Sequence, residues 1–206
     1  MQSGVDSSSS VTATALSCLQ AGGYTFVGRY YSRTTHIEGK KLTAAEAQLL
    51  AEGGMEIVSV YEDAPTESSY FSADRGAEDA ATALEQADLA GQPEGTAIYF
   101  SIDYDASSAD IEGCITAYFE AIDKALAGTY AVGVYGSGAT CTAIMNAGLA
   151  KYAWLAQSSG WSGYHTFDGW AIKQGAEQSV CGLDSDLDEA QADFGAWVPA
   201  STSAAP

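Results

Sequence analysis

Hydrophobic and polar positions along this chain change repeatedly between the period of a strand and the period of a helix. Short apolar or alternating runs predict strands, and longer runs with apolar residues three or four positions apart predict amphipathic helices. The predicted strands cover residues 4–6, 24–31, 55–62, 96–105, 130–137, 152–157, 169–174 and 183–188. The predicted helices cover residues 12–21, 41–53, 72–90, 108–126 and 139–148, with a terminal helical turn after the last strand.

This alternation indicates a parallel sheet with helices outside it. Eight predicted strands favour a closed (β/α)8 barrel over an open doubly wound sheet. The 206 residues are few for that fold, so several helices are expected to be short or missing. We therefore predict one α/β domain, a compact TIM-type barrel, over residues 1–197, and a linker-like Pro/Ser/Ala tail over residues 198–206.

The strand at residues 96–105, TAIYFSIDYD, ends in two carboxylates, Asp103 and Asp105. Side chains alternate along a strand, so both are predicted to share a face with Tyr99 and Ser101. Two partly buried carboxylates at this spacing repel and separate their pKa values, which suits acid/base work on a glycosidic bond. The alternative is that both aspartates only cap the following helix.

Other acidic residues fall where other predicted strands end. Asp6 ends the first strand and Glu62 ends the third. The eighth strand carries three aspartates of one parity, namely Asp184, Asp186 and Asp188. Active sites of (β/α)8 barrels lie at the C-terminal ends of the strands, and the fourth strand faces the first and eighth across the barrel. We therefore predict an acidic cleft at one mouth of the barrel.

Aromatic residues are predicted near the same rim, where flat rings suit sugars. They are Tyr30, Tyr61, Tyr99, Tyr135, Trp154, Trp161, Tyr164 and Trp170. The alternative for part of this set is packing in the core. Arg29 lies among apolar residues and is expected to pair with a buried carboxylate such as Asp6 or Asp103.

Charge and composition narrow the classes of function. The net charge of −19 argues against nucleic acid and anionic membranes as partners. The chain has no apolar run long enough for a transmembrane helix and no glycine-rich nucleotide motif. His36 and His165 are distant in sequence and expected in surface loops, so we expect no metal site and no Ser-His-Asp triad. We expect no cofactor and a monomer.

Several segments occur together in a characteristic order. They are GVD at 4–6, FVGRYY at 26–31, LTAAEAQLLAEGG at 42–54, AIYFSIDYD at 97–105, VGVYGS at 132–137, YAWLAQ at 152–157, and Gln174 followed by GLDSDLDEA at 182–190. In these segments the chain resembles the glycoside-hydrolase-like domain family that is related to the family 25 lysozymes. The resemblance implies a (β/α)8-type barrel that acts on bacterial cell-wall glycan.

The resemblance also implies site residues. In family 25 lysozymes the fourth strand ends in Asp-x-Glu, whose Glu is the catalytic acid. Here Asp103 matches the Asp, and Asp105 stands in place of the Glu. Asp6 matches the Asp of the first strand, and Asp186 matches the Asp of the closing motif. The expected contacts with substrate come from Tyr30, Glu62, Tyr99, Tyr135, Trp154, Trp161, Gln174 and Asp184.

These matches predict a secreted muramidase that cleaves the β-1,4 bond between N-acetylmuramic acid and N-acetylglucosamine in peptidoglycan. Asp105 would be the general acid, and Asp103 or Asp6 would stabilise developing charge or orient the acetamido group. The alternatives are a non-catalytic glycan-binding barrel and a hydrolase of another polysaccharide. The tail is expected to tether the barrel to a wall-binding module.

The chain contains four cysteines, and none of them forms a C-x-x-C motif. We predict the disulfides Cys114–Cys141 and Cys18–Cys181, because each pair joins neighbouring units of the barrel. The alternative is four buried free cysteines.

Overall fold

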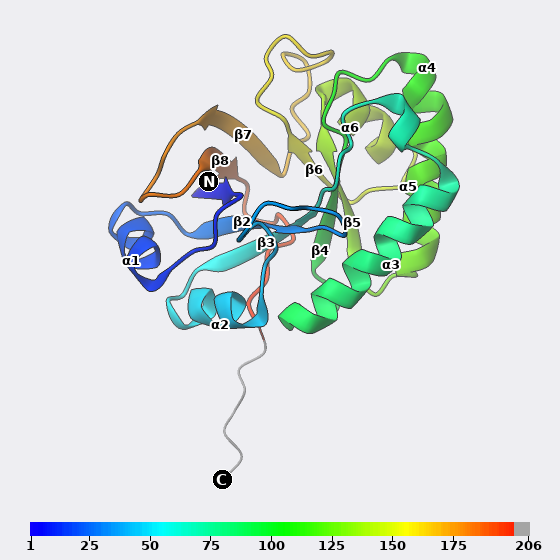
Figure 1. Cartoon of the computed structure of the whole chain (residues 1–206). Helices are drawn as coiled ribbons and strands as arrows, with labels where there is room; N and C mark the ends of the chain where they lie inside the picture. Colours follow the sequence, from blue (N-terminus) through cyan, green and yellow to red (C-terminus); the bar gives the residue numbers. More distant parts are fainter. Residues whose placement is uncertain (200–206) are drawn as a thin grey trace.

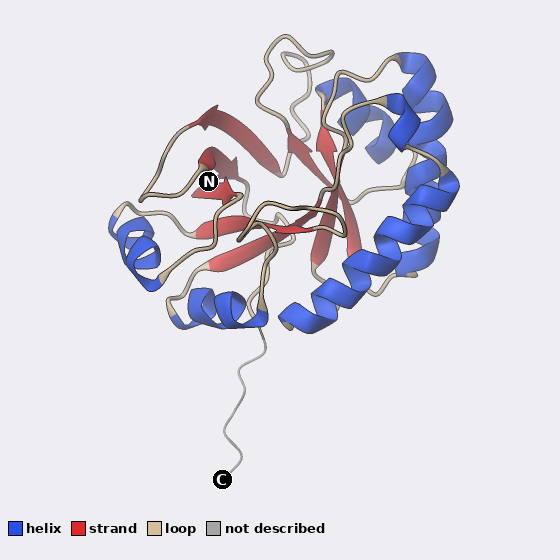
Figure 2. Ribbon diagram, in the orientation of Figure 1, coloured by secondary structure: helices blue, strands red, loops and turns tan. Residues whose placement is uncertain are grey.

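The computed structural model describes residues 1–199, so the predicted tail lies outside the described part from residue 200 onward. The eight strands form a closed barrel in sequence order (Figures 1 and 2). They are β1 (Gln2–Ser7), β2 (Phe26–Tyr31), β3 (Glu56–Tyr61), β4 (Ala97–Ser101), β5 (Ala131–Gly136), β6 (Tyr152–Leu155), β7 (Ile172–Glu177) and β8 (Ser185–Ala190). The predicted (β/α)8-type barrel is therefore confirmed.

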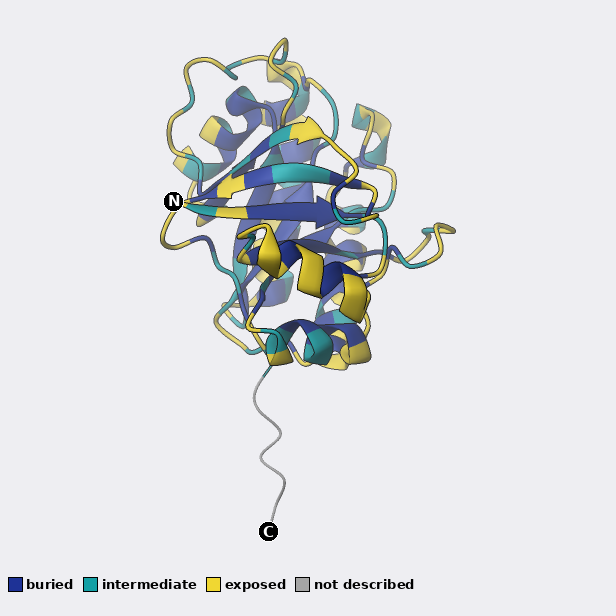
Figure 3. Cartoon of the chain, turned by 90° about the vertical axis from the view of Figure 1, so that its left-hand side faces the viewer, coloured by how far each residue is buried: buried dark blue, intermediate teal, exposed yellow. Residues whose placement is uncertain are grey.

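Helices cover the barrel unevenly. They are α1 (Ala13–Ala21), α2 (Ala44–Glu52), α3 (Ala73–Ala90), α4 (Ser108–Asp110), α5 (Thr116–Leu126) and α6 (Gly138–Asn146). A 3-10 turn (Ser68–Tyr70) precedes α3, and a π-helical turn (Ile111–Ile115) joins α4 to α5. In the described chain no helix lies between β6 and β7 or between β7 and β8, which agrees with the expectation of missing helices. Figure 3 shows half-buried and exposed positions on this uncovered side.

The direction of β8 differs from the prediction of a fully parallel sheet. It pairs antiparallel with both β7 and β1, whereas the other neighbouring strands pair in parallel. Only residues 178–184 connect β7 to β8, and a parallel crossover needs a dozen or more residues. The chain therefore turns back, and β8 begins at the end of the barrel where β1 finishes.

Two hydrophobic clusters hold the barrel together. The inner cluster fills the barrel with large rings, among them Phe26, Tyr99 and Trp154. The outer cluster packs the other face of the strands against the helices, as Ile98 and Phe100 do on β4. This alternation along β4 agrees with the sequence pattern. Residues 191–199 form no helix, so the predicted terminal helical turn is wrong, and Phe194 packs in the inner cluster.

One of the two predicted disulfides is confirmed. Cys18 and Cys181 are bonded and tie α1 to the β7–β8 connection. The predicted Cys114–Cys141 bond is wrong, because both cysteines are free. Cys141 is buried with its Sγ 3.7 Å from the Gly136 carbonyl, whereas Cys114 lies in the π-helical turn with its Sγ 3.5 Å from the Asp110 carbonyl. No described helix is both long and apolar enough to cross a membrane.

Candidate active site

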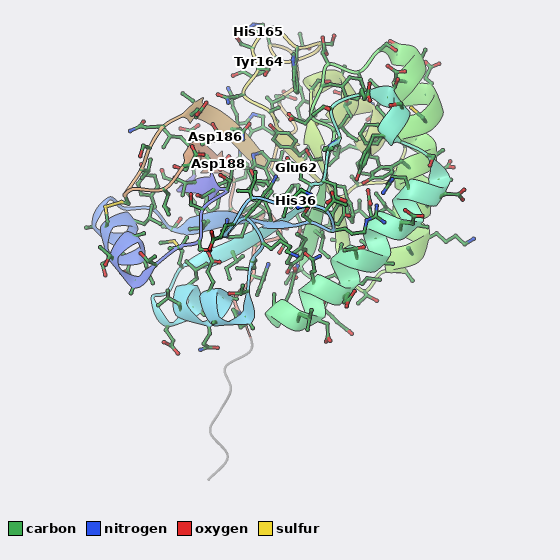
Figure 4. All side chains as sticks on the ribbon, viewed as in Figure 1. His36, Glu62, Tyr164, His165, Asp186 and Asp188 are labelled. Carbon is green, nitrogen blue, oxygen red and sulfur yellow. A yellow bond between two sulfur atoms is a disulfide. The ribbon has the colours of Figure 1, made fainter. Side chains whose placement is uncertain are left out.

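A polar cavity of about 250 Å³ opens at the end of the barrel where the parallel strands finish. It is lined by Asp6, Tyr30, Val60, Glu62, Asp103, Tyr135, Trp154, Gln157, Gln174 and Asp186. Glu62 directly follows β3, and Asp186 lies on β8 (Figure 4). Because β8 runs in the opposite direction, Asp186 reaches the mouth from the start of its strand rather than from its end.

One side of the cavity, which we call the β1–β8 wall, consists of Asp6, Gln174 and Asp186. Asp6 and Asp186 are directly opposed in the antiparallel pairing of β1 with β8. The Gln174 amide nitrogen donates to both carboxyl groups, at 2.9 Å to Asp6 and 3.2 Å to Asp186. The Tyr135 hydroxyl donates to the Gln174 carbonyl at 2.8 Å and so fixes the orientation of the amide. The Tyr30 hydroxyl donates to the other oxygen of Asp6 at 2.6 Å.

Both carboxyl groups of the β1–β8 wall have raised pKa values. Burial raises the pKa of Asp6 to about 6, although the hydrogen bonds from Tyr30 and Gln174 act in the opposite direction. Burial and the neighbouring Asp6 raise the pKa of Asp186 to about 7. A carboxyl group with such a pKa is protonated often enough at neutral pH to act as a general acid.

The opposite side, the β3–β4 wall, consists of Glu62, Asp103 and Lys40. The Lys40 Nζ lies 2.6 Å from Glu62 Oε1 and 4.5 Å from the centroid of the Tyr30 ring. The Ser101 hydroxyl donates to Glu62 Oε2 at 3.3 Å. Burial and the nearby Glu62 raise the pKa of Asp103, whereas Lys40 acts to lower it. This wall therefore places a buried cation beside its carboxylates.

Most of the predicted site residues meet at this cavity. Those that line it are Asp6, Tyr30, Glu62, Asp103, Tyr135, Trp154, Gln174 and Asp186. Asp184 instead borders a smaller recess of about 170 Å³ that also contacts Asp6 and Asp186. His36 and His165 lie in exposed loops, as expected (Figure 4).

Asp105 does not line the cavity, so the prediction that it faces the cleft with Asp103 is wrong. β4 ends at Ser101, and strand alternation therefore does not extend to residue 105. The exposed Asp105 carboxylate accepts hydrogen bonds from the Ser162 backbone N–H at 2.8 Å and from the Ser162 hydroxyl at 3.1 Å. It thus links the segment after β4 to the loop between β6 and β7.

Three further residues lie elsewhere than predicted. Tyr99 is fully buried inside the barrel, and its hydroxyl donates to the Phe194 carbonyl at 2.8 Å. Trp161 lies half-exposed in the loop between β6 and β7 and does not line the cavity. Arg29 points out of the barrel and pairs with Glu46 at 2.8 Å, so its predicted pairing with Asp6 or Asp103 is wrong.

Sequence reasoning missed Lys40 and Gln157, and it assigned no role to Asp188. Lys40 and Gln157 belong to connecting segments, where neither strand nor helix periodicity applies. Asp188 shares the parity of Asp186 on β8, so its inward direction was readable from the sequence.

Comparison with known proteins defines the class of this barrel. The sequence model of the Rv2525c-like, glycoside hydrolase-like domain family matches residues 17–193, and the chain belongs to that family. The resemblance seen in the sequence is thereby confirmed. The chain is similar to the uncharacterized Bacillus subtilis (strain 168) proteins YbfG, at 34% identity over 89% of this chain, and FadG, at 30% over 82%. It spans only 28% and 31% of the lengths of these relatives.

Solved structures share the fold. The Tat-secreted protein Rv2525c of Mycobacterium tuberculosis, crystallised with L-tartrate, matches with a TM-score of 0.84 and 25% identity over 96% of this chain and 99% of that one. A muramidase from Acremonium alcalophilum matches with a TM-score of 0.61 and 14% identity over 94% of this chain and 95% of that one. The autolysin LytC of Streptococcus pneumoniae, solved with a synthetic peptidoglycan ligand, matches with a TM-score of 0.59 and 11% identity. This match covers 91% of this chain and 46% of that one. The last two similarities show the fold alone.

Proposed function

We propose that this domain is a muramidase that hydrolyses the β-1,4 bond between N-acetylmuramic acid and N-acetylglucosamine in peptidoglycan. The observation that carries the proposal is that Asp103 and Asp186, two carboxyl groups with raised pKa, border one cavity from opposite walls of the barrel. Glycoside hydrolysis commonly uses two carboxyl groups that flank the scissile bond, a protonated one as general acid and an ionised one as base or nucleophile. The fold shared with a muramidase and an autolysin supports glycan as the substrate class.

In this proposal Asp186 is the general acid. With a pKa near 7 it holds a proton at neutral pH, and the Gln174 and Gln157 amides stabilise the carboxylate that remains after proton transfer. Asp103 lies on the other wall and acts on water or on the developing positive charge. Tyr30 and Tyr135 offer aromatic surfaces to the sugar rings.

The test is release of reducing ends from purified peptidoglycan, with mass analysis of the fragments. We expect Asp186→Asn and Asp103→Asn each to lower the rate by about 10²- to 10⁴-fold, as for loss of a general acid or base. Asp105→Asn is the matched control, because it makes the same chemical change outside the cavity. Equal losses in all three variants, or fragments without reducing N-acetylmuramic acid, would contradict the proposal.

A second candidate is a glycan-binding barrel without catalysis. It is favoured by Asp105, which stands where the resemblance places the catalytic acid of family 25 lysozymes yet bonds to Ser162 outside the cavity. Under this alternative the wild-type protein would sediment with purified walls but release no reducing ends. Asp186→Asn would then change wall binding, and neither protein would show a measurable rate of hydrolysis.

We also propose that the domain is exported and acts as one monomeric module of a longer wall protein. The Cys18–Cys181 disulfide supports an oxidising compartment, and the relatives are more than three times as long as their matched portions. Immunoblotting of culture medium and cell fractions tests export. Protein confined to the cytoplasmic fraction with free Cys18 and Cys181 thiols would contradict it.

A further inference from the structure

Asp188 is a buried carboxyl group that the proposed reaction does not use. It lies on the inner face of β8, is 3% exposed, and its Oδ1 accepts a hydrogen bond from the Trp154 indole N–H at 3.0 Å. Its Oδ2 is buried, and within residues 1–199 no N–H or O–H group of the protein donates to it. A buried, ionised carboxylate oxygen without a donor is strongly disfavoured. This oxygen is therefore the one expected to carry a proton.

Asp6 is the candidate acceptor for that proton. Asp6 pairs with Asp186 across the β1–β8 ladder and Gly4 pairs with Asp188, so Asp6 and Asp188 are diagonal neighbours on the inner face. A hydrogen bond between their carboxyl groups would satisfy the Asp188 oxygen that lacks a partner. Two carboxyl groups can share such a bond only if one of them is protonated.

The surroundings decide which of the two holds the proton. The oxygens of Asp6 already accept hydrogen bonds from Tyr30 and Gln174, which favours its ionised form. Asp188 has only the Trp154 donor. The titratable groups facing Asp188 are Asp6 from β1, Asp186 from β8 and Tyr99 from β4, all acidic.

We propose that Asp188 is a positioning residue that stays protonated and donates a hydrogen bond to Asp6, which keeps Asp6 ionised at the floor of the cavity. Burial and the negative charge of Asp6 raise the pKa of Asp188 well above its usual range, in agreement with this assignment. The protonation stands on contacts within the barrel, whereas its effect on catalysis rests on the proposed function.

The consequence is an ordered distribution of charge on the β1–β8 wall. Asp6 receives donors from Tyr30, Gln174 and Asp188 and remains a carboxylate, and its charge helps Asp186 to keep the proton that it delivers to the glycosidic oxygen. The Asp188 proton itself is not transferred. Asp188 thus acts on the reaction only through Asp6.

The test compares Asp188→Asn with Asp188→Leu. Asparagine keeps a hydrogen-bond donor toward Asp6 and stays neutral, so the acid limb of the kcat/KM profile should stay in place and the rate within about 5-fold of wild type. Leucine removes the donor, so the acid limb should move to higher pH by about one unit and the rate should fall about 10- to 100-fold. If Asp188 were ionised, Asp188→Asn would remove a negative charge and move the limb to lower pH, which would overturn the proposal.

A second measurement does not depend on catalysis. In protein labelled with ¹³C at the aspartate carboxyl carbons, one resonance should keep its protonated position from about pH 5 to pH 8 and be absent from Asp188→Asn. Absence of this resonance in the wild type would overturn the inference whether or not glycan is cleaved. Its presence in a protein that cleaves no peptidoglycan would uphold the inference and reject the muramidase.

Discussion

The β1–β8 wall and the β3–β4 wall place carboxyl groups around one cavity but give them different partners. On the β1–β8 wall Asp6 and Asp186 meet only neutral donors, chiefly the Gln174 amide. On the β3–β4 wall Glu62 meets the ammonium group of Lys40, which is nearly buried. The negative charge is therefore reduced by protons on one wall and balanced by a cation on the other.

The two walls therefore stabilise negative charge by different means within a single cavity. Amide donors stabilise a carboxylate without adding positive charge, so Asp186 beside Asp6 retains a proton up to about pH 7. A lysine adds positive charge and favours ionised neighbours. On the β3–β4 wall the pKa of Asp103 is raised all the same, because burial and Glu62 outweigh the effect of Lys40. Carboxyl groups in such different environments suit separate acid and base roles. The predictions below alter one wall at a time.

Gln174→Glu should have the largest effect on stability, because it replaces the shared donor of the β1–β8 wall with a further acid. We expect the free energy of unfolding to fall by about 3 kcal/mol at pH 8, with a smaller loss near pH 5 as the new carboxyl group binds a proton. Denaturant titrations at both pH values measure this. Gln157→Glu, at an exposed residue that also contacts Asp186, is the control and should cost less than about 1 kcal/mol.

Lys40→Met should act on the β3–β4 wall. Removing the cation leaves Glu62 without its partner and raises the pKa of Asp103 further, so we expect a loss of about 2 kcal/mol at pH 7. The loss should shrink as pH falls and Asp103, whose pKa is raised, binds a proton. The same denaturant series measures it. Lys41→Met is the control, because the adjacent Lys41 is exposed. Equal losses in the two variants would show that Lys40 does not balance this wall.

Asp186→Asn should make the protein more stable at high pH, although it removes the proposed acid. The folded pKa of Asp186, about 7, lies above its ordinary value, so the folded state binds more protons than the unfolded state between about pH 4 and pH 7. The stability that Asp186 contributes is therefore present below pH 4 and lost as pH rises through 7. The half-buried position limits the difference to about 1–2 kcal/mol in favour of the variant at pH 8. Thermal unfolding across pH 4–8 tests this, and a variant less stable than wild type at pH 8 would contradict it.

Much of this arrangement was predictable because it depends on local periodicity. Alternation along β4 placed Tyr99 on the same face as Asp103, and the ends of the strands identified Asp6, Glu62 and Asp103. These assignments require only that a residue lie in a strand or immediately after it.

The remaining features depend on segments without a period. The direction of β8 follows from the short connection before it, and Lys40 reaches Glu62 from an irregular loop. The Cys114–Cys141 prediction assumed that neighbouring helices turn these residues toward one another, whereas Cys141 points at the ends of β5 and β6. The sequence pattern predicted the helices, but the spacing of these cysteines did not determine the direction in which each side chain points from its helix.

Asp105→Asn should have the smallest effect. It tests whether a residue that stands at the sequence position of the catalytic acid matters for activity although it lies outside the cavity. Its carboxylate contacts Ser162 rather than either wall, and asparagine keeps one acceptor oxygen for the Ser162 N–H. We expect less than about 1 kcal/mol of lost stability and an activity within about 3-fold of wild type. Asp105→Ala, which removes both acceptors, should increase hydrogen exchange in the loop at residues 158–170 and leave the walls unchanged. A loss of activity in Asp105→Asn as large as that of Asp103→Asn would mean that Asp105 enters the cavity during the reaction, and the roles assigned to Asp186 and Asp103 would have to be revised.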